Sequence, residues 1–187
     1  MTTADAVDVL IVGGGAREHA LAWAVERSTR CGRLFVAPGN EATPGERVDI
    51  AADDVPALTN FATTSAIELV IVGPEVALAA GLADALHAAG VTVFGPTRDA
   101  SRLEWDKAFT RRVASELHLP SPAFASFDSA AETDDALKWW RALERPIVVK
   151  QVGLASGKGV AVPIDDDSCE AAIRSFFNSG GVVHPHS

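Results

Sequence analysis

The first half of the chain alternates short apolar runs with helix-like segments, and each of the runs ends in glycine or proline. Apolar runs this short, bounded by turn residues, are typical of buried strands. Strands that alternate with helices predict βαβ units and a parallel sheet, which is an α/β fold. The expected strands are residues 8–13, 34–37, 69–73 and 91–94, and the expected helices are residues 18–27, 55–65 and 76–89.

The second half has a different pattern, because a helix at residues 101–117 leads into a stretch broken by Pro120 and Pro122. Beyond the prolines we expect a small α+β unit with strands at 123–127, 146–150 and 160–162 and helices at 130–143 and 167–177. Gly180, Gly181 and Pro185 disfavour a further helix, and residues 182–183 could only begin a strand. The expected organisation is an α/β domain at 1–102, a helical linker at 103–122 and a small domain at 123–187.

Charge and composition exclude several classes of protein. The formal net charge of −9 argues against a nucleic-acid-binding protein, although a few amides and one or two cations can still form a local phosphate site. No apolar run approaches the roughly 18 residues of a membrane span, and no basic segment precedes the run at 7–12, so we expect a cytoplasmic protein. Two isolated cysteines and scattered histidines predict neither a disulfide framework nor a metal centre.

The first glycine turn joins the first strand to the first helix. Gly13 and Gly15 fit the start of a dinucleotide-binding GxGxxG pattern, but Glu18 stands at the third glycine position. The second strand also ends without the acid that would hold a ribose, so this interpretation fails. A glycine turn feeding a helix N-terminus beside Arg17 can still bind phosphate, and tight strand–helix packing is the alternative.

Two further turns follow the next strands, at residues 38–40 and 73–75. Each alone is an ordinary turn. Because the carboxyl ends of parallel strands share one edge of a sheet, the three turns together are expected to line one crevice.

A second glycine-rich loop, residues 153–159, follows a strand that ends in Lys150. Its spacing is one residue short of a Walker A motif, and Gly159 stands where serine or threonine would bind magnesium. The loop, with Lys150 and Lys158, can still cover phosphates, and a hairpin turn with a solvated lysine is the alternative. Lys107 alone is typical of a solvated helix face.

Six segments of the chain, taken together and in this order, are similar to the glycinamide ribonucleotide synthetases (phosphoribosylamine–glycine ligases) of the ATP-grasp superfamily. These segments are residues 12–23, 36–40, 70–75, 93–96, 106–109 and 147–160. The resemblance covers nearly the whole chain to about residue 164. It implies a parallel-sheet pre-ATP-grasp domain followed by the small α+β ATP-grasp subdomain.

The resemblance also implies two groups of site residues. Those expected near phosphoribosylamine are Gly13, Gly15, Arg17, Glu18, His19, Asn40, Pro74 and Glu75. Those expected near ATP are Lys107, Lys150, Gly153, Ser156, Gly157, Lys158 and Gly159.

The implied reaction activates the carboxylate of glycine as an acyl phosphate, with ATP and Mg²⁺, and the amine of phosphoribosylamine then displaces the phosphate. The implied partners are these small molecules, with no nucleic acid and no membrane. The family continues into a large ATP-grasp subdomain that carries the magnesium ligands, so we expect this chain to be the N-terminal portion of such an enzyme. His184 and His186 could form a metal pair, but the end of a truncated chain is the favoured interpretation.

Three positions depart from the family pattern. Gln151 and Val152 replace smaller or more polar residues beside the glycine loop, and Asp106 puts a negative charge next to Lys107. Two alternatives to the ligase therefore stay open: a non-catalytic module that binds sugar phosphates and nucleotides, and a ligase of the same superfamily that acts on another amine.

Overall fold

The computed structural model describes residues 6–151, 159–178 and 183–186. The chain divides into two compact units, unit 1 (Met1–Ser101) and unit 2 (Arg102–Ser187). Each unit has a hydrophobic core of its own. Within the described residues, no helix combines the length and the apolar character that a membrane crossing needs.

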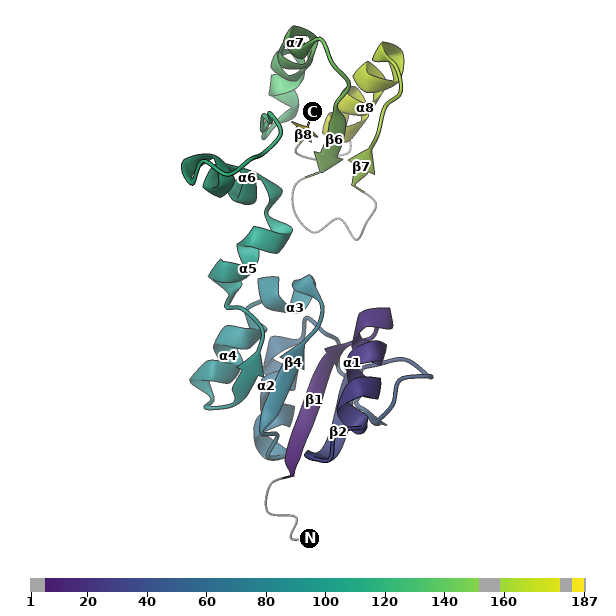
Figure 1. Cartoon of the computed structure of the whole chain (residues 1–187), viewed down its shortest axis with the longest axis vertical. Helices are drawn as coiled ribbons and strands as arrows, with labels where there is room; N and C mark the ends of the chain where they lie inside the picture. Colours follow the sequence, from purple (N-terminus) through teal and green to yellow (C-terminus); the bar gives the residue numbers. More distant parts are fainter. Residues whose placement is uncertain (1–5, 152–158, 179–182, 187) are drawn as a thin grey trace. The chain divides into compact units, whose positions relative to one another are not determined.

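Unit 1 is built on a five-stranded parallel sheet with the strand order β3-β2-β1-β4-β5 (Figure 1). The chain winds outward from β1 to β2 and β3, then crosses to the other side of β1 for β4 and β5. The strands are β1 (Val7–Gly13), β2 (Cys31–Pro38), β3 (Glu46–Arg47), β4 (Leu69–Val72) and β5 (Thr92–Phe94). The predicted α/β class with a parallel sheet is confirmed, and β3 is a short edge strand that the sequence pattern did not predict.

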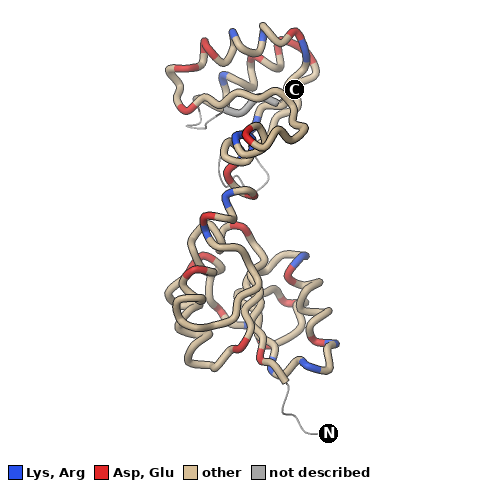
Figure 2. The backbone as a smooth tube through the Cα atoms, turned by 60° about the vertical axis from the view of Figure 1, so that its left-hand side comes forward, with Lys and Arg blue, Asp and Glu red and all other residues tan. Residues whose placement is uncertain are grey.

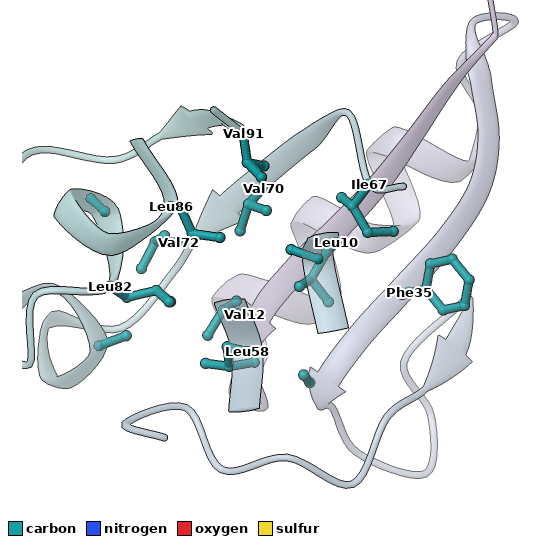
Figure 3. Close-up of a cluster of buried hydrophobic side chains, with 14 of the residues drawn as sticks. Leu10, Val12, Phe35, Leu58, Ile67, Val70, Val72, Leu82, Leu86 and Val91 are labelled. Atoms are coloured by element: carbon teal, nitrogen blue, oxygen red, sulfur yellow. The ribbon is translucent and has the colours of Figure 1, made fainter. Parts of the chain in front are cut away.

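Helices cover both faces of this sheet, which explains why its central strand is apolar throughout. Val9 and Ile11 of β1 pack on the side of α1 (Ala16–Glu26). Leu10 and Val12 point to the opposite face, which is covered by α2 (Val55–Thr64), α3 (Glu75–Ala79) and α4 (Leu82–Ala88). Figure 3 shows Leu82 and Leu86 of α4 near the valines of β4, and Leu58 of α2 beside Val12 of β1, in this larger cluster.

The predicted helix 76–89 is wrong in one respect, because it is two helices. Gly81 has φ 91°, in the left-handed region that glycine reaches without steric cost, and it forms the N-cap of α4.

The predicted helix 101–117 is also two helices, α5 (Arg98–Trp105) and α6 (Lys107–Glu116). Asp106 separates them, because its backbone leaves the helical region and its Oδ1 accepts the N–H of Phe109 at 2.9 Å as the N-cap of α6. Lys107 is therefore the first residue of a helix and not a residue near the middle of one.

Unit 2 contains a three-stranded antiparallel sheet with the order β7-β6-β8. Its core joins Val149 of β6 to Trp140 of α7 and Ile173 of α8. The elements are η1 (Ala130–Glu132), α7 (Thr133–Leu143), β6 (Val148–Gln151), β7 (Val160–Ala161), α8 (Asp166–Asn178) and β8 (Val183–His186).

Two sequence-based expectations for unit 2 are corrected. Residues 123–127 form no strand and contribute only isolated bridges at Phe124 and Phe127, because Phe127 turns into the core instead of continuing a ladder. The C-terminal residues do form a strand: β8 extends to His186 and pairs with β6, and Pro185 is tolerated because β8 is at the edge of the sheet.

Basic and acidic residues are interspersed along the backbone of both units (Figure 2). Such a distribution differs from the basic stripe of a nucleic-acid-binding protein.

Candidate functional site

The candidate sugar-phosphate site is at the carboxyl edge of the sheet in unit 1, where β1, β2 and β4 end. The structure brings the three predicted turns together there through backbone hydrogen bonds. Gly39 N donates to Gly13 O at 3.1 Å, and Gly73 N donates to Val12 O at 3.0 Å. The strand order reverses between β1 and β4, and the carboxyl ends of strands at such a switch point are the usual position of ligands in open α/β sheets.

The turns after β1 and β2 approach each other so closely that one of them has no room for a side chain. A Cβ atom on Gly14 would be 2.7 Å from the carbonyl oxygen of Gly39. Asn40 stabilises the same contact, because its Nδ2 donates a hydrogen bond to Gly14 O at 3.0 Å. Its Oδ1 accepts a hydrogen bond from Ala42 N at 3.0 Å, within its own turn. Both ends of the Asn40 amide are therefore engaged in holding the two turns.

Helix α1 begins at this edge without a side-chain cap. Its N-cap is Gly15, which has no side chain to accept a hydrogen bond from the first turn. By contrast, Asp54 caps α2 and Asp106 caps α6 through their carboxylates. Because the first amides of a helix carry partial positive charge, an uncapped N-terminus at this edge favours an anion.

Glu18 points inward, although it was predicted to lie near the substrate. It is 4% exposed, and its Oε2 accepts the N–H of Gly15 at 2.8 Å. Its Oε1 is buried and has no hydrogen-bond partner among the described residues. The side chain fills the space beside Gly13 and Gly73, so it lies between the ends of β1 and β4.

Arg17 is a cation at this edge, beside the turns after β1 and β4. Its Nε is 3.4 Å from Oε1 of Glu18, and its Nη2 is 3.8 Å from Oε2 of Glu75. Both distances exceed those of good hydrogen bonds, and the Arg17 side chain is 63% exposed. Such exposed, long ion pairs are weak, so the guanidinium can turn to an anion with little loss.

The other predicted substrate residues border the same edge. Pro74 is the N-cap of α3 and Glu75 is its first residue. His19 is half-buried, and its backbone N–H makes the first helical hydrogen bond of α1, to Gly15 O at 3.0 Å. All eight predicted substrate residues thus belong to the three turns or to the helices that begin from them.

The candidate nucleotide residues belong to unit 2. Lys150 pairs with Val160 in the β6–β7 ladder, and Gln151 N donates to Gly159 O at 2.7 Å. Because side chains alternate along a strand and Val149 is buried against the helices, Lys150 is on the opposite face of the sheet. Gly153, Ser156, Gly157 and Lys158 lie outside the described residues.

The charge of Asp106 is compensated within unit 2 rather than set against Lys107 alone. Burial raises the pKa of Asp106, but the N–H of Phe109 and the guanidinium of Arg102 outweigh it and leave the pKa below its ordinary value. Nη2 of Arg102 is 3.1 Å from Oδ2 of Asp106, and the same guanidinium lies over the Phe109 ring at 4.0 Å. Asp106 therefore stays ionised as a helix cap.

A separate cleft of about 660 Å³ opens in unit 2 between the end of α7 and the start of α8. Arg141 and Glu170 form an ion pair of 2.7 Å at its wall. None of the predicted site residues lines this cleft, and no sequence motif indicated it. Its mixed charges and the capped start of α8, where Asp165 accepts Ser168 N at 2.8 Å, favour no particular ligand.

Cys169 forms part of the same wall and provides a test of burial. Removal of the thiol from water raises its pKa to about 11, with a further contribution from Asp166. At pH 8 only about one thiol in a thousand would then be ionised, so we expect Cys169 to resist a disulfide reagent until urea unfolds the chain. The more exposed Cys31 is the internal comparison, and a Cys31→Ser variant isolates Cys169. Rapid labelling of folded Cys31→Ser would contradict this burial.

The fold and the site define a class. The fold, a parallel α/β unit followed by a small antiparallel sheet, is shared with solved ligases. The crystal structure of a Thermotoga maritima phosphoribosylamine–glycine ligase superposes with a TM-score of 0.73 at 23% identity, over 97% of this chain and 44% of that one. An N5-carboxyaminoimidazole synthetase from Staphylococcus aureus in complex with ADP gives 0.74 at 18% identity, over 97% and 47%.

Family models make the assignment more particular. The N domain of phosphoribosylglycinamide synthetase matches residues 7–104, and the ATP-grasp (A) domain of the same enzyme matches residues 105–184. The chain belongs to the phosphoribosylglycinamide synthetase family. It is 46% identical to the phosphoribosylamine–glycine ligase of Vibrio cholerae over 175 residues and 43% identical to that of Haemophilus influenzae over 176. The chain spans 40% of the length of these relatives, and 91% and 92% of its own length is matched.

Proposed function

We propose that this chain is the sugar-phosphate-binding and partial nucleotide-binding portion of an enzyme that ligates glycine to 5-phosphoribosylamine with ATP. The product would be glycinamide ribonucleotide, an intermediate of purine synthesis. The observation that carries the proposal is the uncapped start of α1 beside Arg17, at the carboxyl edge of the sheet in the part of the chain that matches the phosphoribosylglycinamide synthetase N domain. The identity of 46% to a named ligase supports the choice of substrate.

The chemistry of the edge suits the phosphate group of phosphoribosylamine. Backbone amides and the dipole of α1 supply partial positive charge without desolvating a full cation. Arg17 adds a planar fork of donors that matches phosphate oxygens. Glu75, whose side chain is 41% exposed, is an acceptor for hydroxyl or amine groups of the sugar.

Unit 2 would bind part of ATP, which supplies the phosphoryl group that activates the glycine carboxylate. Lys150, on the face of the small sheet opposite Val149, and Lys107, at the first turn of α6, are the cations proposed to contact it. The described residues contain no cluster of three or more acidic, histidine or cysteine side chains suited to a metal. We therefore assign no residue here to the Mg²⁺ that the reaction requires.

Arg17→Ala is expected to weaken binding of ribose 5-phosphate about tenfold, because a charge-assisted bond to phosphate is lost. Titration calorimetry on the 187-residue chain measures the dissociation constant. The matched control is Arg27→Ala, which removes an arginine from the other end of the same helix, where it lies 4.5 Å over the Trp23 ring. Unchanged affinity in Arg17→Ala would remove Arg17 from the site.

The proposed ligase activity is tested on a protein of the relatives' full length, of which this chain spans 40%. ATP hydrolysis should depend on both glycine and phosphoribosylamine, and replacement of either by another amine or amino acid should abolish it. Hydrolysis with a different amine would favour the related ligase. Binding without any hydrolysis would favour the non-catalytic module.

A further inference from the structure

We propose that Glu18 is a positioning residue whose buried carboxylate locks the turns after β1 and β4 together, and that it does not contact the ligand. This contact, called the lock below, would keep the first amides of α1 in the position that binds the ligand. The part of this inference that concerns the ligand rests on the proposed function, whereas the lock itself can be tested without any ligand.

The first observation is the direction of the Glu18 side chain. A glutamate on the first turn of a helix can point into water, where it would still stabilise the helix dipole. Here the residue is 4% exposed, and its Oε2 binds the N–H of Gly15 in the preceding turn at 2.8 Å. The carboxylate therefore fixes the residue that serves as N-cap of α1.

The second observation is the shape of the neighbouring strand ends. At Gly73 the three nearest atoms to an added Cβ are Oε1, Cδ and Cγ of Glu18, all too close to be tolerated. The φ of Gly73 is outside the left-handed region, so its backbone conformation does not require glycine. The space that Glu18 occupies is therefore the physical reason for glycine at this position.

The third observation is the unpaired oxygen. Oε1 is buried without a hydrogen bond among the described residues, and its nearest cation is Arg17, with Nε at 3.4 Å. Buried polar atoms of this kind are uncommon in folded proteins. This atom is shielded from solvent between Gly73 and Arg17, so a ligand could reach it only if Arg17 or the turn of Gly73 moved. The geometry thus favours a positioning role over direct contact.

A double-mutant cycle tests the lock without ligand. Gly73→Ala should lower the melting temperature by about 5 °C or more when Glu18 is present, because the new methyl displaces the carboxylate. In a Glu18→Ala background the same change should lower it by less than about 2 °C, because the obstacle is gone. An equal loss in both backgrounds would overturn the lock.

Gly14→Ala is the matched control for this cycle. The atom nearest to its added Cβ is the backbone carbonyl oxygen of Gly39, which the removal of Glu18 does not clear. Its effect on the melting temperature should therefore be the same with and without Glu18. If Glu18→Ala does not fold, Glu18→Asp takes its place, because its carboxylate is one methylene shorter.

A second experiment tests the effect of Glu18 on the ligand. Calorimetry measures the dissociation constant of ribose 5-phosphate, and NMR measures the chemical shift of the Gly15 amide. Glu18→Ala should weaken binding about tenfold or more and shift the Gly15 resonance, because the helix start is no longer preorganised. Glu18→Gln should stay within about threefold, because its amide oxygen can still accept the Gly15 N–H. A loss of affinity in Glu18→Gln as large as in Glu18→Ala, with the Gly15 resonance unmoved, would show direct contact and overturn the proposal.

If the unmodified chain fails to bind ribose 5-phosphate, the proposed function fails. The double-mutant cycle at Gly73 still decides whether the lock exists.

Discussion

Leu10→Ala is expected to lower the free energy of unfolding of unit 1 by about 2–5 kcal/mol, which is the usual range when a buried leucine is replaced by alanine and leaves a cavity. Leu10 is fully buried in the central strand, where it pairs in register with Phe35 of β2 and Val70 of β4. Helices cover its face of the sheet, so neighbouring side chains cannot collapse into the gap without moving a strand. A domain is typically stable by only about 5–15 kcal/mol, so this single change removes a large share.

Urea denaturation followed by circular dichroism measures the loss, and hydrogen exchange assigns it to the peptides of unit 1. The control is Leu117→Ala, a leucine that is 63% exposed at the end of α6. It should change the stability by less than about 0.5 kcal/mol. Equal effects of the two substitutions would contradict the assignment of Leu10 to the core.

Gly14→Val is expected to reduce the affinity for ribose 5-phosphate at least about 100-fold, because small displacements of binding groups carry large costs. A Cβ here meets the carbonyl oxygen of Gly39 at 2.7 Å, and the branched valine adds two methyl groups to that contact. The turns after β1 and β2 must then separate, which also breaks the bond from Asn40 to Gly14 O. Calorimetry on the folded variant measures the affinity.

A loss of stability alone must be distinguished from damage to the site. Gly90→Ala is the matched control, because it strains a turn with φ 77° that precedes β5, at the opposite edge of the sheet. It should cost about 1 kcal/mol of stability and leave the affinity unchanged. If Gly14→Val bound the sugar phosphate as well as Gly90→Ala, the carboxyl edge would not be the binding site.

The sequence by itself determined four of the five strands of unit 1, its helices apart from the break at Gly81, and the edge at which its turns meet. An apolar run such as residues 69–72, followed at once by glycine and proline, indicates a strand from local sequence alone. A strand buried on both faces must be apolar throughout, and the residues that follow it must form a turn. The glycine turn beside Arg17 allowed either a phosphate site or tight strand–helix packing, and phosphate binding there stays a prediction. The break between α5 and α6 also has a local signal, because aspartate is a preferred N-cap residue. The helical pattern that continues on both sides of Asp106 hid this signal.

Only the tertiary structure decided which way the site residues point. Glu18 and Gly73 are 55 positions apart, and nothing near either residue shows that one fills the space left by the other. Asn40 is similarly engaged with Gly14, and the pairing of β8 with β6 depends on a strand more than thirty residues earlier. The direction and burial of a polar side chain depend on the atoms that surround it in the folded chain. Local sequence specifies the backbone on which Glu18 stands, and the packing of β4 against β1 turns its carboxylate inward.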